Sequence, residues 1–208
     1  AGTLTLLLTG ASLVIRLFSG PLTDRFGRRA MMLAGAALYA LAMVTIALWP
    51  TLGIIAAMQV VFGAGMALLT TASSAAVVDV TPSSRLGEGL GFFTLGNSVA
   101  MAIGPGLGIA LIGESENYNL IYFCAAGLLV LTALLAANVK YQMPLAEKKA
   151  GFHWKDVLEV STLPAAVLQF LVTFSFTSVV TYITSYAQEV GISGIGSFFT
   201  IYALGMIL

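Results

Sequence analysis

Long apolar runs alternate with short polar segments along the whole chain. A helix crosses the roughly 30 Å hydrocarbon core of a bilayer with about 20 apolar residues. Only helices and closed barrels satisfy their backbone hydrogen bonds in lipid, and continuous runs that do not alternate favour helices. The pattern therefore predicts seven spans, at residues 3–21, 30–49, 52–79, 83–112, 119–138, 162–188 and 195–208.

The composition agrees with a protein of the membrane. Of the 208 residues, 59% are hydrophobic and 9% are charged, whereas soluble domains average about 25% charged residues. We therefore predict an all-α, polytopic transmembrane helix bundle in contact with the lipid bilayer. The net charge of zero gives no reason to expect nucleic acid as a partner. The single cysteine, Cys124, and the single histidine, His153, exclude an intrachain disulfide and a Cys/His metal cluster, and we expect no cofactor.

Both ends of the sequence lie inside apolar runs, and residue 1 is not methionine. We interpret the chain as an internal piece of a longer membrane protein, whose first helix would serve for targeting.

The basic residues predict which connections face the cytoplasm. All nine fall at or near the first, third and fifth connections, as Arg16, Arg25, Arg28, Arg29, Arg85, Lys140, Lys148, Lys149 and Lys155. The connections between them contain no Lys or Arg and carry Glu114, Glu116 and Glu189. Because cytoplasmic loops hold the excess of positive charge, we expect a multi-pass protein of the plasma or inner membrane, with Arg25–Arg29 and residues 139–161 in the cytoplasm.

The first connection has a distinctive sequence, Gly20-Pro21-Leu22-Thr23-Asp24-Arg25-Phe26-Gly27-Arg28-Arg29. It resembles the signature loop between the second and third helices of the major facilitator superfamily. The resemblance implies that the spans are family helices two to eight, about seven of twelve. The alternative is an ordinary membrane hairpin with basic anchors.

The resemblance implies a role for this loop as a conformational gate on the cytoplasmic side. Two glycines let helix ends approach closely, and Asp24 can accept charge-assisted hydrogen bonds from arginines. The predicted gate residues are Gly20, Leu22, Asp24, Arg25, Gly27, Arg28 and Arg29. The family pattern also implies three parts: a first helical bundle over 1–138, a cytoplasmic linker over 139–161 and the start of a second bundle over 162–208.

The span at 83–112 carries a stripe of small residues. Gly96, Ala100, Gly104 and Gly108 recur every four residues, and such a face lets another helix pack at close range. Pro105 removes one backbone hydrogen bond. Together with Gly91, the stripe resembles the fifth-helix motif of family antiporters, although Ala100 stands where glycine is usual. This resemblance implies export.

The span at 52–79 departs from the family pattern at Gln59. Many members have an arginine there, four residues before a glycine such as Gly63, and that arginine is linked to proton coupling. A neutral amide can bind a substrate by hydrogen bonding but supplies no fixed charge. The departure counts against proton coupling at this position and leaves it to helices outside this sequence.

Polar side chains recur every three or four residues in two spans. The candidates for lining a substrate cavity are Gln59, Thr70, Ser74, Asn97, Gln169, Thr173, Thr177 and Thr181. One interpretation is that they face a central aqueous cavity. The other is that their polar groups bond their own backbone or bridge neighbouring helices.

The resemblance implies a secondary active transporter that works by alternating access. We expect a monomeric, ion-gradient-driven exporter of small molecules, with H+ as the coupling ion. The alternatives are an uptake transporter for a sugar, amino acid or other metabolite, and a non-transporting sensor or scaffold. The sequence has no nucleotide-binding glycine-lysine loop, and the spans contain no serine, histidine or carboxylate combination for catalysis. We therefore do not expect an enzyme.

Overall fold

The computed structural model of the chain describes residues 2–112, 118–138, 163–190 and 205. The helices of these residues are α1 (Gly2–Phe26), α2 (Arg28–Leu48), α3 (Leu52–Val80), the short 3-10 helix η1 (Ser83–Arg85), α4 (Leu86–Ile112), α5 (Tyr118–Asn138) and α6 (Leu163–Val190). They confirm the first six predicted helices, whereas the predicted span at 195–208 falls outside the described residues except for residue 205. Helices α1, α2, α3 and α5 are long and apolar enough to cross a membrane.

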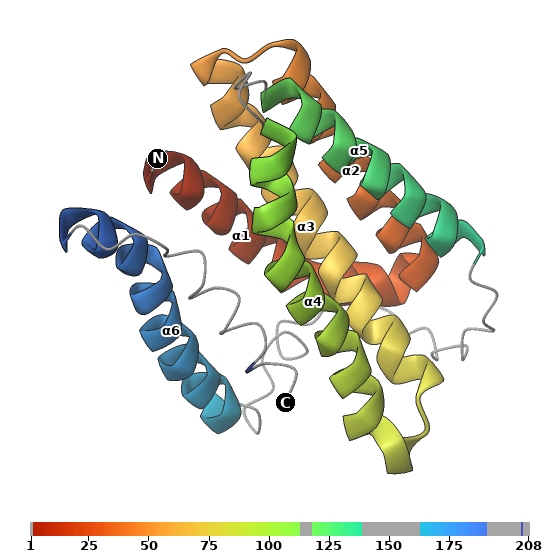
Figure 1. The fold of residues 1–208 in the computed structure, drawn as a ribbon. Helices are drawn as coiled ribbons and strands as arrows, with labels where there is room; N and C mark the ends of the chain where they lie inside the picture. The colour runs from red at the N-terminus through yellow and green to blue at the C-terminus, as the bar shows by residue number, and fades with distance from the viewer. Residues whose placement is uncertain (1, 113–117, 139–162, 191–204, 206–208) are drawn as a thin grey trace.

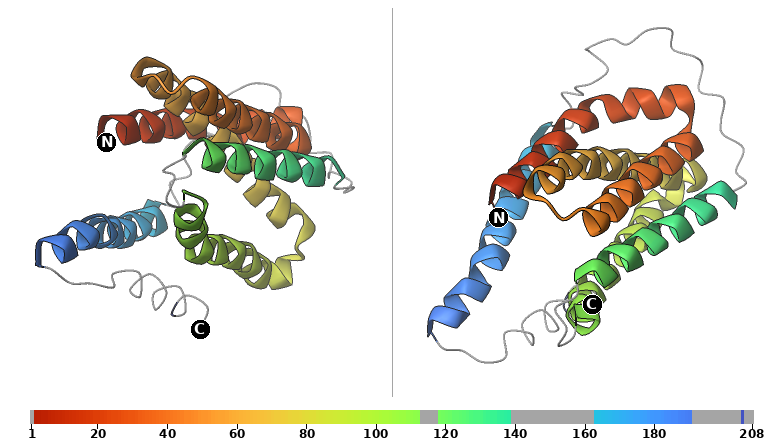
Figure 2. Two further views of the ribbon diagram at one scale, coloured as in Figure 1. Left: turned by 45° about the horizontal axis from the view of Figure 1, so that its top comes forward. Right: turned by 90° about the horizontal axis from the view of Figure 1, so that it is seen from above.

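Helix α3 is at the centre of the bundle formed by α1 to α5 (Figure 1). It packs against α1 and α2, and α5 packs along α2 on the other side. Helix α4 makes smaller contacts with α3 and α5. Helix α6 packs against none of the other described helices, and it lies apart from them in Figure 1 and in the left view of Figure 2. The division into two bundles and a linker stays a prediction.

Glycines allow α3 to approach its two neighbours closely. A Cβ atom at Gly35 of α2 would lie 2.6 Å from the backbone nitrogen of Leu69. A Cβ atom at Gly65 of α3 would lie 2.8 Å from the carbonyl oxygen of Gly35. At the α1–α3 contact, a Cβ atom at Gly63 would overlap the carbonyl oxygen of Leu8. Small residues at such crossings bring helix backbones together in membranes, so these glycines set the packing of the bundle.

The buried core between α2, α3 and α5 consists mainly of small and flexible side chains. One cluster is formed by Ala42, Met43, Ile46 and Ala126, and a second by Met32, Ala72 and Ala136. The rings of Tyr39 and Phe62 stack beside the first cluster, with their centroids 4.3 Å apart. The small alanine side chains let the helices lie close together, as do the glycines where α3 crosses its neighbours.

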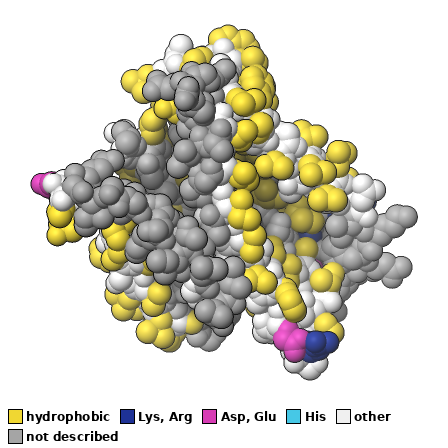
Figure 3. Space-filling view, viewed as in Figure 1, with side chains coloured by type: hydrophobic (Ala, Val, Ile, Leu, Met, Phe, Trp, Pro, Cys, Tyr) yellow, Lys and Arg dark blue, Asp and Glu magenta, His cyan; other side chains and the backbone are white. Residues whose placement is uncertain are grey.

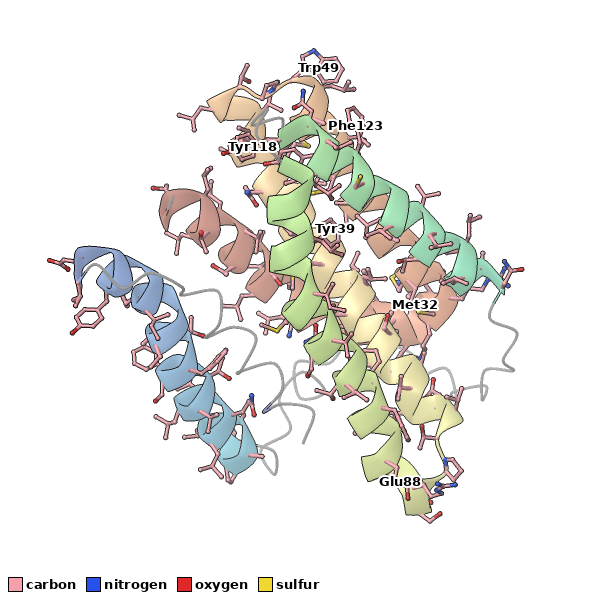
Figure 4. All side chains as sticks on the ribbon, viewed as in Figure 1. Met32, Tyr39, Trp49, Glu88, Tyr118 and Phe123 are labelled. Carbon is pink, nitrogen blue, oxygen red and sulfur yellow. The ribbon has the colours of Figure 1, made fainter. Side chains whose placement is uncertain are left out.

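Large hydrophobic side chains cover much of the described surface (Figure 3). Trp49 and Tyr118 lie at one end of the bundle and Glu88 lies at the other (Figure 4). Trp49 and Tyr118 are both 57% exposed, and such amphipathic rings favour the boundary between membrane and water. The apolar surface with aromatic and charged ends is that of a membrane-embedded bundle.

Candidate functional site

The first connection, predicted between spans that end at residue 21 and begin at residue 30, is much shorter in the structure. Helix α1 continues through Pro21 to Phe26 and α2 begins at Arg28, so that only Gly27 lies outside a helix. The prediction of a loop over the whole motif is wrong, because Thr23 is 1% exposed and holds this last turn in the bundle. Gly27 has a φ of 92°, in the left-handed region that glycine adopts without steric cost. One glycine therefore makes the whole turn.

Arg28 joins three helices from the first position of α2. Its Nε donates a hydrogen bond to Oδ2 of Asp79 in α3 at 2.9 Å, and its Nη1 donates to Oδ1 of Asp24 in α1 at 2.5 Å. Nη1 also lies 3.3 Å from the carbonyl oxygen of Thr23. The side chains of Arg28 and Asp79 are 14% and 19% exposed, whereas that of Asp24 is 62% exposed. The Arg28–Asp79 pair is thus the shielded half of the cluster.

The contact between Asp24 and an arginine was predicted from the sequence, but the part played by Asp79 was not. The sequence did contain a signal for it, since Asp79 is the acidic residue at the end of the third predicted span. Helices in an antiparallel bundle bring that end next to the start of the second span. The three-helix geometry follows from this topology.

The other gate residues lie on the surface of the turn. Leu22, Arg25 and Arg29 are exposed, and the Arg25 guanidinium lies 5.4 Å from the ring centroid of Phe26. A Cβ atom at Gly20 would meet nothing within 4 Å. The expected close approach of another helix at Gly20 is therefore not seen among the described residues. Within the same part of the chain, Arg29 forms no ion pair.

A line of polar contacts, here called the polar seam, continues from the arginine cluster along the α1–α3 interface. Ser19 is 1% exposed and its hydroxyl lies 3.0 Å from Oγ1 of Thr71. One turn earlier, Nη2 of Arg16 lies 3.4 Å from Oγ1 of Thr70. Ser19 and Thr71 were not predicted as site residues, because isolated hydroxyls in an apolar run give no sign of which helix they face.

The hydroxyls of Thr70 and Ser74 in α3 bond to their own helix. Oγ1 of Thr70 donates to the carbonyl oxygen of Met66 at 2.8 Å, and Oγ of Ser74 donates to that of Thr70 at 2.9 Å. These hydrogen bonds agree with the second interpretation, in which the hydroxyls bond the backbone of their own helix. Gln59 is different, because its Oε1 is buried and has no hydrogen-bond partner among the described residues.

The candidates on α6 stand apart from those on α3. Nε2 of Gln169 lies 3.1 Å from Oγ1 of Thr173, and both side chains are exposed, as is that of Thr177. The side chain of Thr181 lies outside the described part, and Asn97 is exposed on α4. Because α6 does not pack against α3, the described residues do not form one cavity from the two stripes.

The stripe of small residues on α4 faces open space in the described part of the protein. A Cβ atom at Gly91, Gly96, Gly104 or Gly108 would meet nothing within 4 Å. Ala100 is exposed, and the side chain of Pro105 lies outside the described set. Close packing of another helix on this face stays a prediction, with no partner among the described helices.

The apolar bundle, the glycine turn and the arginine cluster define a polytopic helical membrane protein. The chain belongs to the Major Facilitator Superfamily, whose family model matches residues 1–208. This confirms the resemblance seen in the signature loop. The fold and the family agree.

Curated relatives include several resistance proteins. The chain is 29% identical to a chloramphenicol resistance protein of Pseudomonas aeruginosa, over 98% of this chain and 45% of that protein. It is 25% identical to multidrug resistance protein 2 of Bacillus subtilis, over 79% and 42% of the two chains. It is 27% identical to multidrug resistance protein MdtG of Serratia proteamaculans, over 75% and 38%.

The chain spans less than half of the length of these relatives. The family is one of transporters, which move solutes across membranes without transforming them, in agreement with the expectation that the protein is not an enzyme.

Proposed function

We propose that this chain forms part of a secondary active exporter of small molecules, driven by an ion gradient. The main support is the signature loop, whose Arg28 ties α1, α2 and α3 together at one end of the bundle. The resistance relatives and the antiporter-like stripe on α4 favour export over uptake. The positive connections favour a cytoplasmic location for this end of the bundle.

The arginine cluster suits a gate that holds one conformation. The shielded Arg28–Asp79 pair fixes α2 to α3, so the two helices move as a unit. Asp24 is 62% exposed, and its Oδ2 has no hydrogen-bond partner among the described residues, so this oxygen can meet groups on a second bundle. A carboxylate accepts several hydrogen bonds, and charge-assisted bonds are the strong ones. Asp24 would therefore join the two bundles when the cytoplasmic side closes and release them when it opens.

The substrate class follows from the charges of the spans. The middles of α2, α3 and α5 carry no Asp, Glu, Lys or Arg, and Arg16 is the one charged residue near the middle of α1. A charged ligand among α2, α3 and α5 would lack a counter-ion. A neutral or weakly charged amphiphile fits better. Chloramphenicol, after which one relative is named, is a neutral amphiphile of this kind. Gln59 provides a carbonyl oxygen without a described partner, which could accept a hydrogen bond from such a substrate.

Proton coupling is proposed from the antiporter resemblance and not from Gln59, which carries no charge. An ion-binding carboxylate elsewhere in the full-length protein would supply it. Such groups in transporters lie near the midplane between the bundles.

Transport by the full-length protein in proteoliposomes tests this proposal. We would load the vesicles with chloramphenicol and measure flux with and without an imposed pH gradient, using protein-free vesicles as the control. The proposal predicts flux that accelerates when protons can exchange for the substrate. Flux that ignores the pH gradient would remove the proton-coupled assignment, and uphill accumulation in the inward direction would identify an uptake transporter.

A further inference from the structure

An apolar groove runs between α2 and α5 on the outside of the bundle. Its volume is about 280 Å³. Its walls contain only aliphatic side chains. One wall is formed by four residues of α2: Leu33, Ala36, Ala37 and Ala40. The facing wall is provided by Leu129, Val130, Ala133, Leu134 and Ala137 of α5. Alanines on both walls leave a shallow channel between two helices that run side by side.

The groove opens toward the surroundings of the bundle. Neighbouring large side chains stand outside it, among them Leu41, Leu128, Leu131 and Leu135, which are 51–65% exposed. Both helices are long and apolar enough to span a membrane, so this apolar face is suited to contact with hydrocarbon. The segment of α2 from Leu33 to Ala40 rises about 10 Å, which fits within one leaflet of a core about 30 Å thick.

One end of the groove carries a positive charge. Arg29 precedes Leu33 by four residues, so it lies one helical turn away on the same face of α2. Its side chain is exposed, and it forms no ion pair within the described part of the chain. Arg28, the preceding residue, by contrast forms ion pairs with two carboxylates. An exposed cation that forms no ion pair with the described residues therefore lies one helical turn beyond the groove.

We propose that this groove binds one anionic phospholipid, with an acyl chain between α2 and α5 and the phosphate on Arg29. The apolar channel matches the acyl chain of a phospholipid, and the cation one turn beyond its end matches the anionic phosphate. Basic pockets between membrane helices bind anionic headgroups in this way. The occupant is a lipid of one leaflet, because the groove covers about a third of the thickness of the hydrocarbon core.

Native mass spectrometry of the full-length protein in detergent tests the proposal. We would titrate phosphatidylglycerol and phosphatidylcholine with identical acyl chains and measure the retained lipid. The wild type should retain one phosphatidylglycerol in preference to phosphatidylcholine. Because one basic residue near a membrane surface contributes about 1 kcal/mol, Arg29→Gln should reduce that preference about fivefold. Arg29→Lys should restore it.

Two variants separate the groove from the rest of the surface. Ala37→Phe places a ring in the groove and should reduce retention of both lipids, because Ala37 is an exposed residue of its wall. Ala57→Phe adds the same ring at an exposed position of α3 outside the two described grooves and should leave retention unchanged. Arg25→Gln removes an exposed charge from α1 and should also have no effect.

Three results would overturn the proposal. Equal retention of the two lipids by the wild type would exclude recognition of the headgroup. An equal effect of Arg25→Gln and Arg29→Gln would assign the preference to diffuse surface charge. Undiminished retention in Ala37→Phe would place the lipid elsewhere. If Ala37→Phe does not fold, the comparison of Arg29→Gln with Arg25→Gln decides the matter.

Discussion

The Arg28 cluster contains two ion pairs that should differ in strength, and this difference can be measured. Arg28 contacts Asp79 through Nε at 2.9 Å and Asp24 through Nη1 at 2.5 Å. Distance alone would make the second pair the stronger one. Exposure reverses the order, because the Asp79 side chain is 19% exposed and the Asp24 side chain is 62% exposed.

The magnitudes follow from these environments. Arg28 and Asp24 are four residues apart and partly in water, and such pairs contribute about 0.3–0.5 kcal/mol. The Arg28–Asp79 pair is a shielded hydrogen bond between charged groups, for which the contribution is about 1.5–3 kcal/mol. The pair also closes a contact between residues 51 positions apart, whereas the Asp24 contact joins residues four positions apart on either side of Gly27. Loss of Asp79 should therefore weaken the whole bundle.

Double-mutant cycles measure each coupling energy separately. One cycle combines Arg28→Gln with Asp79→Asn, and the other combines Arg28→Gln with Asp24→Asn. The free energy of unfolding of the full-length protein would be measured in mixed detergent by titration with a denaturing detergent. We expect a coupling energy of about 1.5–3 kcal/mol for Asp79 and of at most about 0.5 kcal/mol for Asp24. Repeating the titration at high salt should reduce the Asp24 coupling more.

A larger coupling energy for Asp24 than for Asp79 would refute the reasoning from exposure. Equal values would show that Asp24 is shielded in the full-length protein, and the assignment of Asp79 as the structural partner would be lost.

Three further predictions concern backbone and packing. Gly27→Ala should destabilise the protein by about 1–3 kcal/mol, because a φ of 92° with a ψ of 148° lies close to a backbone region that is essentially restricted to glycine; thermal unfolding measures the loss, and an unchanged melting temperature would contradict it. Gly63→Leu should abolish folding or force α1 away from α3, since even a Cβ atom at this position overlaps the carbonyl oxygen of Leu8. The control Gly53→Leu should fold normally, because a Cβ atom there would meet nothing within 4 Å. Size-exclusion chromatography and melting curves distinguish the two variants. Gln59→Leu should stabilise by about 1–3 kcal/mol by removing an unpaired buried oxygen; a loss of stability would reveal a partner outside the described residues.

Much of the fold could be predicted from the sequence because membrane spans leave a strong local signal. The six helices follow from apolar length, and the predicted spans agree with them to within a few residues. The signal fails at the end of α1, where Pro21 and several charged residues suggested a loop. The helix continues there through Thr23, which is 1% exposed and so is enclosed by the fold, and whose carbonyl oxygen accepts a hydrogen bond from Arg28 of α2. A long-range contact of this kind has no trace in local hydropathy.

The candidate site was predicted in part. The signature motif named Asp24 and Arg28, which do form an ion pair. Asp79 and the Ser19–Thr71 contact depend on which faces of α1, α2 and α3 meet. Those faces are set by the glycine crossings at Gly63 and Gly65, which were not predicted as packing sites.

The cavity candidates could not be decided from helical periodicity. A hydroxyl that points into a cavity and one that bonds its own backbone have the same spacing in the sequence. Thr70 and Ser74 bond their own helix, and Gln59 alone among the candidates on α3 keeps a buried oxygen without a described partner. The spacing placed these residues on one helix face but carried no information on their hydrogen bonds.

The proposed gate is tested most directly by measuring transport and binding together in one variant. In Asp24→Asn, the rate of substrate flux into proteoliposomes and the Kd of the same substrate would be compared with the wild type. Because Asp24 is exposed and contributes little to folding, the variant should bind the substrate with an unchanged Kd but transport it more slowly. Binding and transport that fall by the same factor would contradict a gate at Asp24.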